Sequence, residues 1–291
     1  MKKIQGILPA LVTPLREDET INVPVLHQLI NDQLAGGSQG FYVGGATGEG
    51  IALRREVREE LAEEAVKAVN HRAPCIVHIA SADFAEAVAL AKHAEACGAD
   101  MISAIPPIFF QYDEDDVFHY YKKLCEAVSI PMMIYYNPAA GFPMTAAFAA
   151  RVFEIDNVTA IKWTSPNFYQ LASLKDMTHG EMTVINGPDE MMLSGLSAGA
   201  DGAIGTTYNI QLDAALGVYN SFTKGDIAEA WAQQCRINRV VDVLKNYVTI
   251  PFTKVILEKQ GYAVGNCVFP MKRYSEEEKD MMYAAYLAAR A

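Results

Sequence analysis

The stretch PMMIYYNPAAGFPMTAAFAARVFEIDNVTAIKW, residues 131–163, contains the repeating unit that decides the fold. It begins with an apolar run (131–136), continues with a segment of helical pattern (145–154) and ends with a second β-type run (158–163). The runs are largely apolar rather than alternately apolar and polar, which is typical of strands buried on both faces of a parallel sheet. The stretch therefore predicts a strand–helix–strand unit.

The same alternation recurs along most of the chain. The other β-type runs are GILPALVT (6–13), GFYVGG (40–45), CIVHIA (75–80), MISAIPP (101–107), MTVING (182–187) and DGAIG (201–205). The helical segments are expected at 23–36, 54–70, 84–98, 113–128, 145–154, 166–177, 189–198 and 211–223. Eight such units over about 225 residues predict an α/β fold of the (β/α)8 TIM-barrel type. The alternative is an open doubly wound sheet, but its dinucleotide-binding version needs a G-x-G-x-x-G that does not follow the first run.

The pattern changes near residue 226, where the strand signals stop. Three helical segments follow, at 227–248, 251–261 and 275–291. We therefore expect a barrel domain over residues 1–225 and a C-terminal three-helix extension over residues 226–291.

The composition limits the kind of partner. The chain has 291 residues, 24 of them Lys or Arg and 35 Asp or Glu, with a formal net charge of −11. This balance argues against nucleic-acid binding and against a polybasic membrane patch, but a pocket with local donors can still bind a small acidic substrate. No run of 18 apolar residues and no signal-peptide pattern is present, so we expect no membrane span and a cytoplasmic protein. The five cysteines form no C-x-x-C pair and the six histidines no H-x-x-x-H pair, so no metal site is expected.

Lys162 stands at the end of a predicted strand, where a barrel places its catalytic groups. Desolvation there lowers the pKa of a lysine, and the neutral amine can form a Schiff base with a carbonyl substrate. The other interpretation is a strand-end lysine that reaches solvent or pairs with a carboxylate. Tyr135 ends the preceding strand and could transfer a proton to and from the substrate oxygen, although a tyrosine in this position can also serve packing alone.

The turn GGATGEG (44–50) follows the second strand. Its backbone N–H groups and the Thr47 hydroxyl could hold a carboxylate, while its glycines also suit a tight turn. We interpret Glu49 as a structural carboxylate. Asp189 and Glu190, in NGPDE, could accept hydrogen bonds from a polyhydroxylated substrate, or they could be favourable charges at a helix N-terminus.

These residues together resemble the N-acetylneuraminate lyase/dihydrodipicolinate synthase family of class I, pyruvate-dependent aldolases, over essentially the whole chain. GFYVGGATGEG resembles the G-[ST]-T-G-E turn of that family, MIYYNP resembles its Y-N-x-P segment, and AIKWTS resembles the strand that carries its Schiff-base lysine. The segments IKWTSPNFYQL, NGPDE and SGLSAGADGAIGTTYN are most similar to the N-acetylneuraminate lyases. A dihydrodipicolinate synthase would have an arginine shortly after Y-N-x-P, and YYNPAAGFPMT has none.

The resemblance implies a lyase without metal or organic cofactor, in which Lys162 forms an imine with pyruvate or the pyruvoyl end of a sialic acid. It implies a homotetramer, a proton-transfer role for Tyr135, and a sugar-derived substrate. The implied substrate-binding positions are Ala46, Thr47, Thr164, Gly187, Asp189, Glu190 and Thr206. Cleavage of N-acetylneuraminate is the first expectation. An aldolase for a shorter 2-keto-3-deoxy sugar acid, a dihydrodipicolinate synthase-type condensing enzyme and a non-enzymatic keto-acid sensor are the alternatives.

Three positions depart from the family pattern. Ala46 replaces a residue that usually carries a hydroxyl beside the substrate carboxylate. Phe110 stands where many members have a tyrosine that reaches across a subunit contact, and Tyr136 replaces an asparagine. Of the three hydroxyls in the family's proton relay, only that of Tyr135 is expected here.

Overall fold

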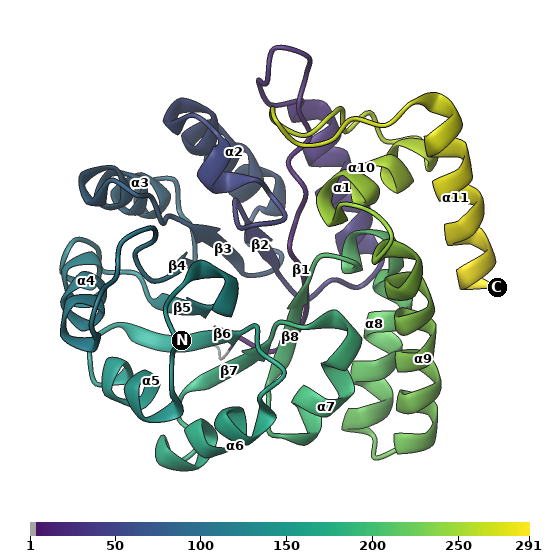
Figure 1. The fold of residues 1–291 in the computed structure, drawn as a ribbon. Helices are drawn as coiled ribbons and strands as arrows, with labels where there is room; N and C mark the ends of the chain where they lie inside the picture. Colours follow the sequence, from purple (N-terminus) through teal and green to yellow (C-terminus); the bar gives the residue numbers. More distant parts are fainter. Residues whose placement is uncertain (1–3) are drawn as a thin grey trace.

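Eight parallel strands form the centre of the computed structural model, which describes residues 4–291 (Figure 1). They pair in the order β1-β8-β7-β6-β5-β4-β3-β2, and an isolated parallel bridge between Ala10 and Tyr42 joins β1 to β2. The strands are β1 (Gly6–Pro9), β2 (Phe41–Val43), β3 (Cys75–His78), β4 (Met101–Ala104), β5 (Met132–Tyr136), β6 (Val158–Trp163), β7 (Thr183–Asn186) and β8 (Gly202–Gly205). The predicted (β/α)8 barrel is confirmed.

Helices alternate with these strands and surround the ring (Figure 1). They are α1 (Val23–Ala35), α2 (Arg55–Val69), α3 (Phe84–Ala96), α4 (Glu114–Glu126), α5 (Ala146–Phe153), α6 (Phe168–Met177), α7 (Met192–Ser197) and α8 (Tyr208–Thr223). In α2 the buried residues Val57, Leu61, Ala65 and Ala68 recur at intervals of three or four, which places them on the face toward the strands.

Three further helices follow the barrel: α9 (Ile227–Leu244), α10 (Thr249–Lys259) and α11 (Glu276–Arg290). In Figure 1 they form a group beside α1 and α8. One cluster of buried side chains joins α8 to α9, and another joins α10 and α11 to α1 and to Val12, which follows β1. The three C-terminal helices therefore pack on the barrel beside α1 and α8. The division into two domains at residue 225 stays a prediction.

The structure differs from the predicted elements mainly at their ends. The strand expected over 6–13 ends at Pro9, and the helix expected over 189–198 is a 3-10 turn, η3 (Asp189–Met191), followed by α7. Helix α8 begins at Tyr208 rather than at 211, because its first turn is separated from the rest by a kink at Gln211, with φ −150° and ψ 43°. Within residues 4–291 no helix is both long and apolar enough to cross a membrane.

Candidate active site

Lys162 and Tyr135 lie side by side near the carboxyl ends of adjacent strands. They are register partners in the β5–β6 pair, and the Lys162 Nζ lies 4.2 Å from the centre of the Tyr135 ring. Lys162 is only 6% exposed, and no carboxylate among residues 4–291 lies within ion-pair distance of it. The interpretation of Lys162 as a solvated or ion-paired strand end is therefore excluded.

The Tyr135 phenol releases its proton more readily than an ordinary tyrosine. Burial alone would raise its pKa, but the charge of Lys162 and contacts with Asn137 and Thr164 outweigh burial, and the net pKa lies below the usual 10.0. The Asn137 Nδ2 donates a hydrogen bond to the Tyr135 oxygen at 3.4 Å. A buried amine thus lies beside a hydroxyl suited to proton transfer.

The turn 44–50 brings Thr47 to the same end of the barrel. A Cβ on Gly50 would lie 1.7 Å from a carbonyl oxygen of the turn, so only glycine fits there. Thr47 Oγ1 lies 2.6 Å from Thr206 Oγ1, and this hydrogen bond joins the turn to the loop after β8. The N–H groups of Thr47 and Gly48 make no hydrogen bond within the described chain. The turn is thus tight and also has free donors for an anion.

Glu49, in the same turn, is a structural carboxylate, as expected. Its Oε1 lies 2.6 Å from the Lys254 Nζ of α10, and both side chains are closed to solvent. Its Oε2 accepts a hydrogen bond from the Val268 N–H at 2.7 Å, while Lys254 donates to the Asn266 carbonyl. This buried ion pair ties segment 266–271 to the mouth of the barrel.

The two acids after β7 have different surroundings. Asp189 is buried, and its Oδ2 accepts a hydrogen bond from the Thr207 N–H at 2.8 Å. A Cβ on Gly205 would lie 2.1 Å from the other oxygen, so the carboxylate lies against the end of β8. Burial raises the pKa of Asp189 to about 6. Glu190, in contrast, is exposed.

Thr164 and Gly187 are in direct contact. A Cβ on residue 187 would lie 2.0 Å from Thr164 Oγ1, so the hydroxyl occupies the space that a larger residue would need. This hydroxyl is buried and makes no hydrogen bond of standard geometry within residues 4–291. Buried polar groups normally have a partner, and this hydroxyl contacts the Tyr135 phenol, so it is a suitable contact for a bound molecule.

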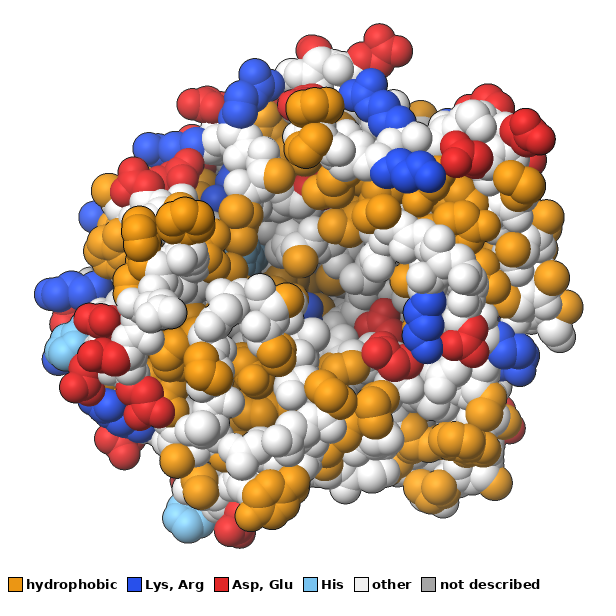
Figure 2. Space-filling view, viewed as in Figure 1, with side chains coloured by type: hydrophobic (Ala, Val, Ile, Leu, Met, Phe, Trp, Pro, Cys, Tyr) orange, Lys and Arg blue, Asp and Glu red, His pale blue; other side chains and the backbone are white. Residues whose placement is uncertain are grey.

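A cavity of about 940 Å³ opens at this end of the barrel. Figure 2 shows a hollow near the centre of the view, with many hydrophobic side chains on its left and a group of charged ones on its right. Of the predicted site residues, only Ala46 and Tyr135 line the cavity, while Phe110, 69% exposed, is at its rim beside Phe109. The remaining wall comes mostly from the loops after β4 and β5.

Three residues of this region were not anticipated from the sequence. Tyr42 donates a hydrogen bond to Ser103, and its ring centre lies 5.0 Å from the Lys162 Nζ. His78 lines the cavity, and burial lowers its pKa to about 3, so its ring is neutral. Met271 reaches the cavity from the tail. His78 ends β3, so the same expectation that selected Lys162, a polar residue at a strand end, would also have selected His78. No sequence pattern around Met271 indicates that it lies at the cavity.

The cysteines and other metal-binding side chains are dispersed. All five cysteines are free thiols. Within the part of the chain that the structure describes, no three His, Cys, Asp or Glu side chains are grouped to hold a metal ion.

Comparisons with known proteins cover nearly the whole chain. The model of the dihydrodipicolinate synthetase family matches residues 3–289. An N-acetylneuraminate lyase of Rhizobium meliloti is 32% identical over 276 residues, 95% of this chain and 92% of that protein. Among solved structures, CdNal from Clostridium difficile, in complex with mannosamine, is 30% identical with a TM-score of 0.95 and covers 99% of this chain and 100% of its own. Proteus mirabilis N-acetylneuraminate lyase is 28% identical with a TM-score of 0.94, over 99% of both chains.

Proposed function

The chain belongs to the dihydrodipicolinate synthetase family, and from this premise we propose that it is a Schiff-base lyase that cleaves N-acetylneuraminate to pyruvate and N-acetylmannosamine. The proposal rests above all on one observation, the buried Lys162 amine beside the Tyr135 phenol with no carboxylate of residues 4–291 within ion-pair distance. Supporting it, curated relatives at 32–33% identity are N-acetylneuraminate lyases.

In the proposed reaction the neutral Lys162 amine attacks the keto carbon and water leaves, which forms an iminium. The iminium accepts the electron pair of the C–C bond as that bond breaks. Tyr135, as the phenolate, takes the proton of the substrate hydroxyl that becomes the aldehyde. Its lowered pKa favours this role. Protonation of the resulting enamine and hydrolysis then release pyruvate and restore the amine, so no metal or organic cofactor takes part.

The substrate is proposed to span two sides of the barrel mouth. The Thr47 hydroxyl and the free N–H groups of the turn 44–50, which includes Ala46, hold the carboxylate. The sugar hydroxyls contact the opposite side. The residues assigned there are Thr164, Gly187, Asp189, Glu190 and Thr206. The hydrogen bond between Thr47 and Thr206 supports a common site, because it joins the two sides directly.

An aldolase for a shorter 2-keto-3-deoxy sugar acid is the second candidate. The observation that favours it is the loss of hydroxyls at Ala46 and Phe110, both at the cavity. A dihydrodipicolinate synthase-type activity is disfavoured by the absence of an arginine in 135–145, and a keto-acid sensor by the presence of both Lys162 and Tyr135. We further propose a cytoplasmic homotetramer, following the family resemblance.

Borohydride trapping tests the chemistry. The protein is incubated with pyruvate and borohydride, and the adduct is mapped by mass spectrometry. We expect an adduct at Lys162, none in Lys162→Arg, and an unchanged yield in Lys224→Arg, which alters an exposed lysine. Absence of an adduct at Lys162 refutes the Schiff-base proposal. Pyruvate release from N-acetylneuraminate and from shorter keto-deoxy sugar acids then decides the substrate, and preference for the shorter acids selects the second candidate.

A further inference from the structure

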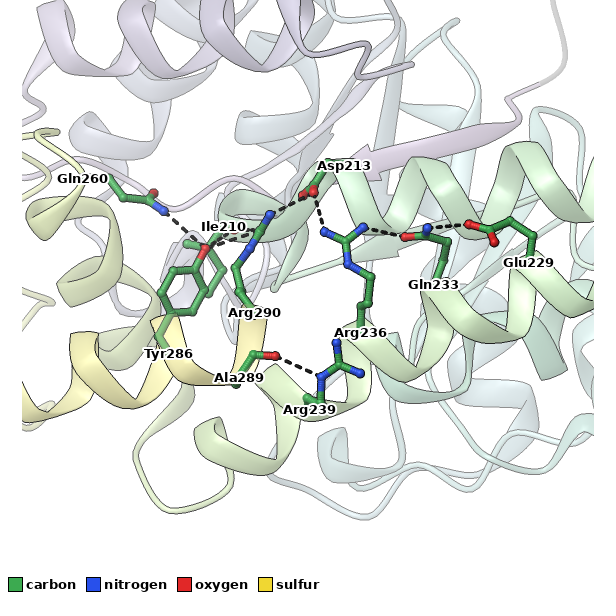
Figure 3. A network of polar contacts seen from close by, with 10 residues as sticks. All are labelled: Ile210, Asp213, Glu229, Gln233, Arg236, Arg239, Gln260, Tyr286, Ala289 and Arg290. Atoms are coloured by element: carbon green, nitrogen blue, oxygen red, sulfur yellow. Dashed lines mark hydrogen bonds and ion pairs between the residues drawn. The ribbon is translucent and has the colours of Figure 1, made fainter.

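The C-terminal helix α11 contacts the first turn of α8 at one carbonyl group. Tyr286 donates a hydrogen bond from its hydroxyl to the Ile210 carbonyl at 2.6 Å, and Arg290 donates from Nη1 to the same oxygen at 3.0 Å (Figure 3). Tyr286 is 2% exposed. Ile210 directly precedes the kink at Gln211, so this carbonyl belongs to the short first turn of α8. The same turn is also tied to the end of β1, because the Asn209 Nδ2 donates to the Ala10 carbonyl at 2.6 Å.

That short turn is connected by hydrogen bonds to the predicted sugar side of the site. The Ile210 N–H donates to the Thr207 carbonyl at 3.0 Å, and the Thr207 N–H donates to the Asp189 carboxylate at 2.8 Å. The adjacent Thr206 hydroxyl is bonded to Thr47. A continuous series of contacts therefore leads from α11 to the residues assigned to the substrate.

On the pyruvate side, Thr47 is joined to this turn through Thr206, but within residues 4–291 no hydrogen bond joins the turn to the imine-forming pair. Lys162 and Tyr135 are on β6 and β5, and they are held by strand pairing with each other. A displacement of the turn 206–210 would therefore move the sugar contacts and leave the imine-forming pair in place.

We propose that Tyr286 and Arg290 are positioning residues for the substrate: they fix the turn 206–210 and thereby place Thr206 and Asp189 for the sugar end. This inference rests on the proposed lyase function. Loss of their bonds weakens binding of the sugar end and spares imine formation with pyruvate. Loss of a hydrogen bond of ordinary strength corresponds to about a threefold to tenfold rise in KM.

The chain offers a matched control for this test. Arg239 of α9 donates to the Ala289 carbonyl of α11 at 3.1 Å and makes no contact with Ile210 (Figure 3). Arg239→Ala thus removes one bond to the same helix without touching the turn. Arg290→Lys retains a donor for the Ile210 carbonyl, while Arg290→Ala and Tyr286→Phe each remove one.

The experiment measures KM and kcat for N-acetylneuraminate, the pyruvate concentration for half-maximal borohydride trapping, and Tm. We expect KM to rise about threefold to tenfold in Tyr286→Phe and Arg290→Ala, with kcat and pyruvate trapping within about twofold of the parent and partial recovery in Arg290→Lys. Arg239→Ala should lower Tm without changing KM. An unchanged KM in variants of lowered Tm, or an equal loss of pyruvate trapping, overturns the positioning role.

Hydrogen exchange separates this inference from the proposed function. If the parent protein cleaves no sugar acid, the proposed function fails on that result alone. Exchange of the Thr207 and Ile210 amides should still be faster in Tyr286→Phe and Arg290→Ala than in Arg239→Ala. Equal exchange in all three variants shows that α11 does not hold the turn.

Discussion

Tyr135 and Lys162 face each other at one register position of the β5–β6 pair, and the lysine charge lowers the pKa of the phenol against the effect of burial. Removal of that charge should therefore raise the pKa. We expect Lys162→Met to shift the titration of Tyr135 to higher pH than in the parent protein. The measurement is the tyrosinate absorbance of each protein minus that of its Tyr135→Phe counterpart. Lys162→Arg keeps the charge and should keep the lowered pKa, whereas an unshifted titration in Lys162→Met would contradict the assignment.

Tyr135→Phe should separate imine formation from C–C cleavage. In the proposed reaction this hydroxyl takes the proton at the substrate oxygen, so we expect its loss to lower kcat by about 10²–10⁴. Borohydride trapping of pyruvate should persist, since the lysine is unchanged. Tyr136→Phe, one residue away, serves as the control and should keep its activity. A Tyr135→Phe variant with near-normal turnover would assign proton transfer to another group.

Asp189 should make the stability of the protein depend on pH. Its folded-state pKa of about 6 exceeds the ordinary 3.8, so between these values the folded protein retains a proton that the unfolded chain has released. The free energy of unfolding should fall as pH rises through this window, by up to about 3 kcal/mol relative to Asp189→Asn. Chemical denaturation of both proteins at several pH values measures the difference. Parallel curves for the two proteins would show that the carboxylate is not protonated in this way.

Ala46→Ser tests whether a hydroxyl at this position assists proton transfer. Residue 46 lines the cavity together with Tyr135, so a serine there can join the hydrogen bonds around a bound substrate. We expect kcat to rise about fivefold, as one added hydrogen bond would allow. Ala52→Ser adds the same group elsewhere on the cavity wall and should have no effect. A lower or unchanged kcat in Ala46→Ser would mean that the enzyme does not use this hydroxyl.

The Glu49–Lys254 pair should be strongly coupled in stability. Removal of one partner leaves a buried charge alone, so Glu49→Gln and Lys254→Met should each lower the free energy of unfolding by about 3–5 kcal/mol. The double variant should lose less than the sum of the two, because neither charge is left unpaired. The exposed pair Lys123–Glu126 is the control, and Lys123→Met should leave the free energy of unfolding nearly unchanged. Additive losses in denaturation experiments would show that the ion pair contributes no coupling.

The eight strands could be predicted because each is a compact run of largely apolar residues, and the parallel barrel follows from their alternation with amphipathic helices. The positions of Lys162 and Tyr135 followed from the same pattern, since both lie near the carboxyl ends of strands. Contacts between distant segments were not predictable. Met271 reaches the cavity and Lys254 pairs with Glu49 because the C-terminal segment folds back over the barrel mouth. No local sequence pattern indicates that the chain returns there.

The kink in α8 shows a second limit to what the sequence alone can predict. The pattern of apolar residues indicated a helix from 211 onward, and the structure begins it at Tyr208 with non-helical angles at Gln211. The first turn is held by hydrogen bonds to distant segments, among them those from α11 and the one from Asn209 to Ala10. The local periodicity of the sequence does not indicate such contacts.

The ion pair between Glu49 and Lys254 also has a consequence for the newly made chain. About two hundred residues separate the two positions, so at about 5–20 residues per second the ribosome adds the lysine on the order of 10–40 s after the glutamate. Throughout that interval a buried Glu49 would lack its cation, which opposes closure of the turn that carries Thr47. The barrel mouth therefore reaches its native form only after the tail has been translated, and an interrupted product remains without a finished site.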